Sequence, residues 1–206
     1  MAFTSRCKRP INRTIPYLRD TRLIIIATEG TDTERQYFES ELFYNHRVQV
    51  KVLKTIGGLS APNHVLKRLK EFAKETDLQG DDQLWLMVDK DRWGEKLLSF
   101  VCSHAIKGRR HTAKLSISNP CFEIWLYLHC SNWSKGSVNS SDIEKELRSV
   151  LGSYNKSNIN IANFASGVDK AVKRAEKMDT QSGVRWPSNP GTHVYKVVKE
   201  IRNLMS

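Results

Sequence analysis

The sequence predicts an α/β fold built on a parallel β-sheet, with a helical extension at the C-terminal end. Short apolar runs alternate with longer segments in which apolar residues recur at helical spacing. The first run, at 23–28, is apolar and rich in isoleucine, as in a strand that is covered on both faces. From residue 119 onward the pattern is mostly helical. Strands that alternate with helices indicate a parallel sheet flanked by helices.

The first half of the predicted sheet comes from residues 23 to 55. The strand at 23–28 leads into a helix expected over 31–45, because Thr31 and Glu34 have the spacing of a capping box. A second strand is expected over 48–55, where valine alternates with polar residues. Alternation of this kind predicts a strand with one wetter face.

The second half of the sheet follows a Gly-Gly break. Pro62 suits the first position of a helix, and the residues after it are apolar at helical spacing. A third strand is expected over 83–88, a helix over about 94–106 and a fourth strand over 114–118. We therefore expect four parallel strands.

The remainder of the chain predicts helices at 120–130, 141–151, 161–178 and 191–205. The triplet Ser-Asn-Pro occurs at 118–120 and again at 188–190. In each case we expect the asparagine to cap a helix and the proline to occupy its first turn. The expected organisation is a basic arm over 1–22, an α/β core over 23–130 and a helical extension packed on the core over 131–206.

The chain is strongly basic. Its 206 residues carry 33 Lys and Arg against 22 Asp and Glu, a formal net charge of +11. An excess of this size favours a polyanionic partner, and nucleic acid is the commonest. The candidate phosphate contacts are Arg9, Arg13, Lys107, Arg109, Arg110 and Lys114. The alternative for the basic loop at 107–111 is a solvated loop without a ligand.

The localisation expected from the sequence is cytoplasmic. The longest purely apolar runs have five residues, so we expect no membrane span and no membrane partner. The basic N-terminus has no apolar stretch after it, and we expect no signal peptide. The four cysteines include no Cys-x-x-Cys pair, which favours free thiols over a zinc site.

Three acids are expected where ligands bind in parallel α/β folds, beyond the carboxyl ends of the strands. Glu29 follows the first strand, and Asp89 and Asp91 follow the third. Residues two apart in an extended chain point to the same side, so the two aspartates can converge. Two such carboxylates repel each other unless a cation joins them, and hard oxygen ligands suit Mg²⁺ or Mn²⁺. The alternative is that both aspartates cap a helix that starts near Trp93.

Glu123 is a further candidate. It is the acid in the stretch 121–130, a predicted helix that is apolar almost all the way round. A helix of this kind is buried, and a buried carboxylate needs a cation as partner. Glu123 is therefore either an accessory acid of the site or one half of a structural salt bridge. His129 points elsewhere and is expected to be a satisfied core histidine.

Four segments of the sequence together resemble the RloB-like proteins. These segments are "IIIATEGTDTERQYF", "LWLMVDKDRW", "SISNPCFEIWLYLH" and "NPGTHVYKVV". RloB-like proteins are identified as carriers of a Toprim-type domain, related to the nuclease domains of OLD enzymes, topoisomerases and DnaG-type primases. The resemblance implies a four-stranded parallel Toprim core, with Glu29 as the Toprim glutamate and with Asp89 and Asp91 as its D-x-D pair.

The resemblance also implies an activity. Toprim domains bind divalent metal through these acids and perform phosphodiester chemistry, and RloB-like proteins sit in bacterial mobile defence loci, typically beside an ATPase. We therefore expect an Mg²⁺- or Mn²⁺-dependent nuclease that acts on DNA or RNA, tRNA included, in anti-phage defence with an ATPase partner. Water is the expected nucleophile.

Two alternatives come from other classes of protein. One is a non-catalytic nucleic-acid-binding subunit that regulates a defence ATPase. The other is a D-x-D enzyme of a different fold. Haloacid-dehalogenase-type phosphatases place their D-x-D after the first strand, where this chain has Glu29. Nucleotide-sugar transferases also use a D-x-D pair with Mn²⁺, but the basic arm argues against this class.

Overall fold

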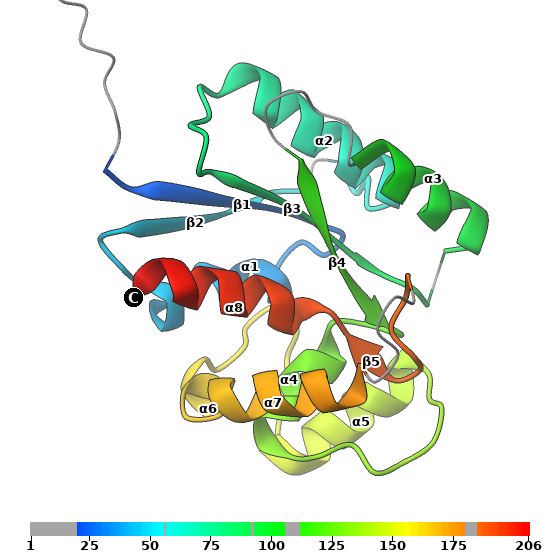
Figure 1. The fold of residues 1–206 in the computed structure, drawn as a ribbon. Coiled ribbons are helices and arrows are strands. Elements are labelled where there is room, and N and C mark those ends of the chain that lie inside the picture. The colour runs from blue at the N-terminus through cyan, green and yellow to red at the C-terminus, as the bar shows by residue number, and fades with distance from the viewer. Residues whose placement is uncertain (1–19, 56, 92, 106–111, 180–184) are drawn as a thin grey trace, which may run out of the picture.

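A computed structural model describes residues 20–55, 57–91, 93–105, 112–179 and 185–206. At its centre lies a five-stranded sheet in the order β2-β1-β3-β4-β5 (Figure 1). The strands are β1 (Arg22–Thr28), β2 (Val48–Leu53), β3 (Gln83–Asp89), β4 (Ala113–Asn119) and β5 (Gly191–Thr192). The first four are parallel, and the short β5 pairs antiparallel with β4. The α/β class and the four predicted parallel strands are confirmed.

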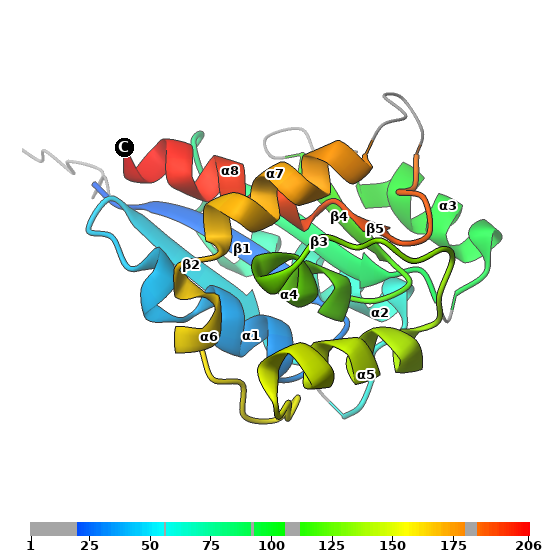
Figure 2. The same cartoon turned by 90° about the horizontal axis from the view of Figure 1, so that it is seen from below.

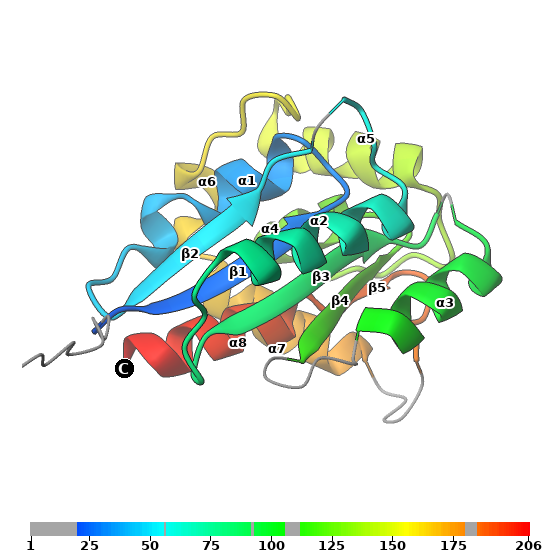
Figure 3. The ribbon, with the colours of Figure 1, turned by 90° about the horizontal axis from the view of Figure 1, so that it is seen from above.

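Helices cover both faces of this sheet. They are α1 (Thr33–Phe38), α2 (Pro62–Glu75), α3 (Glu95–Ala105), α4 (Glu123–Cys130), α5 (Ser140–Leu151), α6 (Ala162–Ala165), α7 (Val168–Met178) and α8 (Val194–Met205). Figure 3 shows α2 and α3 lying across one face. Figure 2, from the opposite side, shows α1, α4, α7 and α8 over the other face, with α5 and α6 further out. None of the helices in the described ranges is long and apolar enough to cross a membrane.

The alternation of side chains along β1 explains how one strand serves two cores. Ile24 and Ile26 pack with the larger cluster, on the side of α1, α4 and α8. Leu23, Ile25 and Ala27 point to the other face and pack with α2 and α3. Successive side chains of a strand point to opposite faces, so an uninterrupted apolar run is what a doubly covered strand requires.

The helix predicted over 31–45 is shorter than expected. It ends at Phe38, and a 3₁₀ turn follows at Glu41–Phe43. Ser40 Oγ donates to the Tyr37 carbonyl (2.7 Å), and the Glu39 side chain accepts the Val52 N–H of β2 (2.9 Å). Short polar side chains that bond the backbone compete with helix formation. The sequence pattern did not show that the Glu39 side chain would accept a backbone hydrogen bond from β2.

Both Ser-Asn-Pro predictions were wrong. Asn119 is the last residue of β4, α4 starts only at Glu123, and the second triplet precedes β5. The Asn119 side chain donates to the Pro187 carbonyl (3.0 Å) instead of capping a helix. Asn189 bonds the backbone of Val138 with both its side-chain oxygen and its nitrogen, each at 3.0 Å. These asparagines therefore join distant segments of the chain.

The C-terminal third of the chain takes part in the main core. Its segment 191–192 forms β5, and Val194, Val197 and Ile201 of α8 pack in the same cluster as Ile24 and Ile26. The predicted helix at 161–178 is broken into α6 and α7 at Gly167. A Cβ at Gly167 would lie 2.6 Å from the His129 carbonyl oxygen, so glycine permits the close approach to α4.

Tyr37 and His129 form a buried polar pair within the larger core. The Tyr37 hydroxyl lies 2.9 Å from His129 Nε2, and His129 Nδ1 lies 2.9 Å from the Trp125 carbonyl. Since a carbonyl only accepts, Nδ1 carries the proton and Nε2 accepts from Tyr37. Burial lowers the pKa of His129 to about 4, so the ring is neutral at pH 7. The expectation of a satisfied core histidine is confirmed.

We predict that Tyr37→Phe lowers the free energy of unfolding by about 1–3 kcal/mol, because it leaves a buried imidazole nitrogen without a donor. Urea denaturation at pH 7 measures the effect. Tyr44→Phe is the matched control, because the Tyr44 side chain is 85% exposed. Equal stability of the two variants would contradict the importance of the Tyr37–His129 bond.

Candidate functional site

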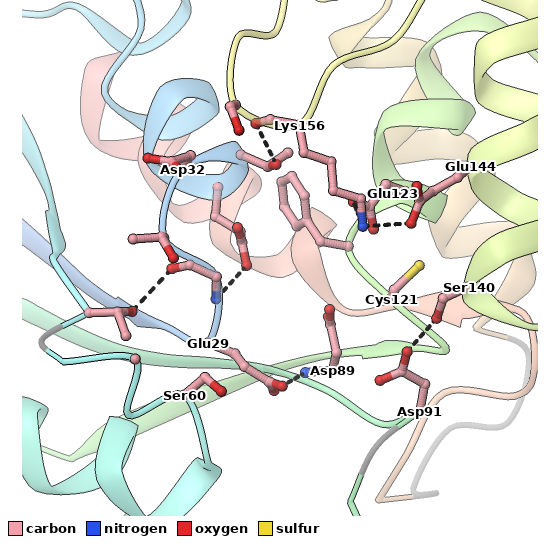
Figure 4. Close-up of a pocket in the computed structure, with 18 residues that line it drawn as sticks. Glu29, Asp32, Ser60, Asp89, Asp91, Cys121, Glu123, Ser140, Glu144 and Lys156 are labelled. Carbon is pink, nitrogen blue, oxygen red and sulfur yellow. Dashed lines mark hydrogen bonds and ion pairs between the residues drawn. The ribbon is translucent and has the colours of Figure 1, made fainter.

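A cavity of about 380 Å³ opens at the carboxyl ends of β1 and β3. Figure 4 shows carboxylates pointing into it from several elements. Its acidic lining consists of Glu29, Asp32, Glu34, Asp89, Asp91, Glu123 and Glu144. The three acids predicted to converge thus line one cavity, at the sheet edge where parallel α/β folds bind ligands.

Glu29 and Asp89 lie side by side because β1 and β3 are neighbouring parallel strands in register. The Asp89 backbone N–H donates to Glu29 Oε2 (3.3 Å), and Trp93 Nε1–H donates to Glu29 Oε1 (2.8 Å). The Glu29 side chain is buried, and these donors fix the direction of its carboxylate. Both hydrogen bonds hold the carboxyl group in place at the edge of the sheet.

Asp91 lines the same cavity, but different contacts hold it in place. Its backbone N–H donates to the Pro120 carbonyl (3.2 Å), and its side chain accepts a short hydrogen bond from Ser140 Oγ. Ser140 is the first residue of α5, and Figure 4 shows this contact at the rim of the acid cluster. The alternative role of Asp91 as a helix cap has no support, because α3 starts only at Glu95.

Glu34 is a buried acid whose place in the site was not predicted. The sequence pattern predicts a capping box, but Asp32 is the N-cap and Glu34 Oε1 accepts the Gly30 N–H (3.1 Å). A Cβ at Gly30 would lie 2.2 Å from Glu34 Oε2, so a larger residue at position 30 would displace the carboxylate. Burial, together with the charges of Glu123 and Glu29, raises the pKa of Glu34 to about 7.

Asp89 is an acid whose charged form is strongly disfavoured in this cavity. Loss of hydration raises its pKa well above the usual range, and repulsion from the carboxylates of Glu34, Glu123, Glu29 and Asp91 raises it further. An acid surrounded by acids holds a proton unless a cation takes the proton's place. The electrostatics of the cavity therefore favour a cation next to Asp89.

Glu123 lies on the opposite side of the cavity and has a cationic partner. The Lys156 Nζ atom lies 2.9 Å from Glu123 Oε1 and 2.6 Å from Glu144 Oε1, and the Tyr154 hydroxyl donates to Glu123 (3.2 Å). Glu123 is therefore both a cavity residue and one half of an ion pair, so the two interpretations of the sequence are compatible. Burial and the charge of Glu123 raise the pKa of Tyr154, which keeps the phenol protonated.

Several residues of the site were missed in the sequence. Ser140, Glu144, Tyr154 and Lys156 come from a segment whose pattern predicts only surface helix and loop. Glu34 carried a signal, since it lies in the same short motif as Glu29 and Gly30, but its spacing from Thr31 favours a capping box. Spacing in the sequence does not indicate that α5 and the loop after it close over the sheet edge.

Of the basic candidates, the structure describes Lys114 alone. Arg9, Arg13, Lys107, Arg109 and Arg110 lie outside the described residues. Lys114 lies near the start of β4, at the end of the strand away from the acids, and its ammonium is 2.8 Å from Glu200 Oε1. Its role as a phosphate contact stays a prediction.

The donor set of the cavity is hard oxygen. As placed, the His, Cys, Asp and Glu side chains of the described residues form no group of three or more close enough to hold a metal ion together. Burial raises the pKa of the Cys121 thiol, and the carboxylates of Glu123 and Asp89 raise it further, so the thiol holds its proton beside these acids. Mg²⁺ is commonly held by one or two carboxylates together with waters and substrate phosphates. The carboxylates present fit that mode of binding.

Fold and cavity together define a class: an α/β protein with an acidic cavity at the carboxyl end of a parallel sheet. The family model described as RloB-like protein matches residues 24–201, so the chain belongs to the RloB-like family. Comparison with curated proteins and with solved structures gave no match. The matched range includes β1 through most of α8, and with them the whole described lining of the cavity.

We predict that Glu34→Gln becomes more stable relative to the parent as the pH rises from about 4.5 to 7 in the presence of a chelator. Below pH 4.5 both states of the parent protein keep Glu34 protonated. Between its ordinary pKa of 4.5 and the folded pKa of about 7, the unfolded chain loses this proton more readily. The parent therefore loses up to roughly 3 kcal/mol across this window.

Urea denaturation of both proteins at several pH values measures this difference. The amide of the substituted side chain keeps an oxygen for the Gly30 N–H, so the hydrogen bond survives in Glu34→Gln. Glu41→Gln, at an exposed position on the same segment, controls for loss of a surface charge. A difference between Glu34→Gln and the parent that does not change with pH would contradict the raised pKa of Glu34.

Proposed function

We propose that this chain carries a Toprim-type domain and cleaves phosphodiester bonds of nucleic acid with Mg²⁺ or Mn²⁺. One observation carries the proposal: Glu29, Asp89 and Asp91 extend from the ends of neighbouring parallel strands into one cavity, where burial and then repulsion between the carboxylates raise the pKa of Asp89. A divalent cation relieves that repulsion and at the same time binds a phosphate.

The residues proposed to hold the cation are Asp89 and Asp91, with Glu29 as a further ligand. Asp91 is oriented by Ser140, and Glu29 by Trp93 and the Asp89 N–H. When bound, the metal ion would supply a Lewis acid that polarises a phosphoryl oxygen. The protein's part is to fix these carboxylates before the substrate arrives.

Hydrolysis needs a group that takes a proton from the attacking water. In the proposed reaction, the water oxygen bonds to phosphorus as an ester P–O bond breaks, and the leaving oxygen takes a proton from solvent. Glu34, with a pKa of about 7, suits the acceptance of the water's proton at Oε2, because Oε1 already accepts from Gly30. Tyr154 is a poor nucleophile since its pKa is raised, which favours water as the attacking group.

The net charge of +11 supports nucleic acid as the substrate class. The proposed substrate is DNA or RNA, tRNA included. The resemblance to defence proteins suggests a role in anti-phage defence beside an ATPase partner, and both remain part of the proposal.

A non-catalytic role is the second candidate. In this alternative the chain binds nucleic acid and regulates an ATPase, and the acids serve no reaction. The specific observation in its favour is that the described carboxylates, as placed, form no group of three around a metal position. Cleavage assays on the purified chain, with and without the proposed ATPase partner, separate the two candidates.

We predict that Asp89→Ala abolishes Mn²⁺-dependent cleavage of DNA or RNA and leaves nucleic-acid binding unchanged or tighter. Loss of this carboxylate removes a proposed metal ligand and one negative charge from the path of the phosphate. The melting temperature should not fall, because the Asp89 charge is repelled by its neighbours. Gel-based cleavage, fluorescence anisotropy and thermal unfolding give the three readouts.

Asp81→Ala is the matched control. Asp81 lies just before β3, at the opposite end of the strand, and pairs with Arg22 on the surface. It should cleave like the parent. If Asp89→Ala also cleaves like the parent under the same metal, the proposed mechanism fails.

A further inference from the structure

Lys156 is the cation that the described chain places in the acidic cavity. Every other charged residue of the described lining is an Asp or a Glu. The Lys156 ammonium lies 2.9 Å from Glu123 and 2.6 Å from Glu144, and the lysine side chain is 47% exposed. Figure 4 shows it beside these two glutamates, on the side of the cavity away from Glu29.

The loop that carries Lys156 is anchored by its backbone. Thr33 Oγ1 donates to the Lys156 carbonyl (3.0 Å), and Gln36 Nε2 donates to the same oxygen (3.3 Å). Gln36 also accepts the Ile159 N–H (3.0 Å). These contacts attach the backbone of the loop to α1, the helix that supplies Glu34. The position of the ammonium is therefore set by this anchored backbone as well as by the lysine side chain.

The acids of the cavity therefore divide into two groups with different partners. Glu123 and Glu144 share the ammonium of Lys156, whose pKa they raise. Glu29 and Asp91 accept hydrogen bonds from Trp93 and Ser140, and Asp89 lines the cavity beside them. One group has a resident positive charge, and the other lies where the proposed function places a metal ion.

We propose that Lys156 takes the place of a second metal ion, so that the site binds one divalent cation instead of two. This inference rests on the proposed function, which supplies the first cation. Two-metal phosphodiesterase sites hold both ions about 3.5–4 Å apart between shared carboxylates. Here an ammonium already occupies the bridge between Glu123 and Glu144. The ammonium is a compact point charge, and part of the Lys156 side chain is exposed. It could therefore contact a phosphate bound in the cavity.

The test counts bound Mn²⁺ on the full chain, stripped of metal, by equilibrium dialysis and by electron paramagnetic resonance. The parent should bind one Mn²⁺ per chain. Lys156→Ala should bind two, because it frees two carboxylates that are already spaced around a cation. Lys156→Arg keeps the charge and should bind one. Lys135→Ala is the matched control, since Lys135 also pairs with a glutamate of α5 but lies outside the cavity lining.

Stability gives a second readout. Lys156→Ala leaves Glu123 buried without its cation, so the metal-free variant should melt at a lower temperature than the parent. Added Mn²⁺ should raise the melting temperature of Lys156→Ala by more than that of the parent, because an additional ion binds the folded state. Lys156→Gln, with a longer polar side chain, repeats the measurement if the alanine variant does not fold.

The outcomes separate the inference from the proposed function. Two Mn²⁺ ions bound to the parent would overturn the role of Lys156, and so would a single ion bound to both the parent and Lys156→Ala. Absence of Mn²⁺ binding by the parent and by every Lys156 variant would instead overturn the metal site of the proposed function. The double variant Lys156→Ala/Glu144→Gln should return to one ion, which assigns the second ion to Glu144.

Discussion

Repulsion among carboxylates that a parallel sheet brings together is the constraint on which the rest of this structure depends. The register of β1 and β3 places Glu29 beside Asp89; Glu29 is buried, and loss of hydration raises the pKa of Asp89. Unbalanced, charges of this kind oppose folding. Hydrogen bonds offset part of this cost. Trp93 Nε1–H and the Asp89 backbone N–H donate to Glu29, and Ser140 Oγ donates to Asp91. The raised pKa values of Asp89 and Glu34, which burial and neighbouring carboxylates cause, show that part of this cost is not offset.

The chain after β4 supplies the remaining support for the cavity. Phe122 and Trp125 anchor the start of α4 in the larger core, and this packing holds Glu123 at the cavity wall. Helix α5 contributes Ser140 and Glu144, and the loop after it contributes Lys156. The helices that the sequence suggests as an appendage are thus part of the wall of the site, and their packing determines where its charges lie.

The parallel strands and the place of the three acids could be predicted from the sequence for a physical reason. Strands buried on both faces require continuous apolar runs, and the topology of a parallel sheet fixes where their ends meet. The contributions of β5, Ser140 and Lys156 could not be predicted, because they depend on contacts between segments far apart in the chain. The asparagines at 119 and 189 illustrate the limit. Their local pattern fits a helix cap, but they bond Pro187 and Val138 instead.

We propose that the acids at the ends of β1 and β3 form a divalent cation site. Anomalous diffraction from crystals of the chain grown with Mn²⁺ tests it most directly, because the signal locates the ion itself. We predict an anomalous peak within coordination distance of Asp89 and of Asp91 or Glu29. Crystals at saturating Mn²⁺ with no peak in the cavity, or with a peak only at another surface, would contradict it.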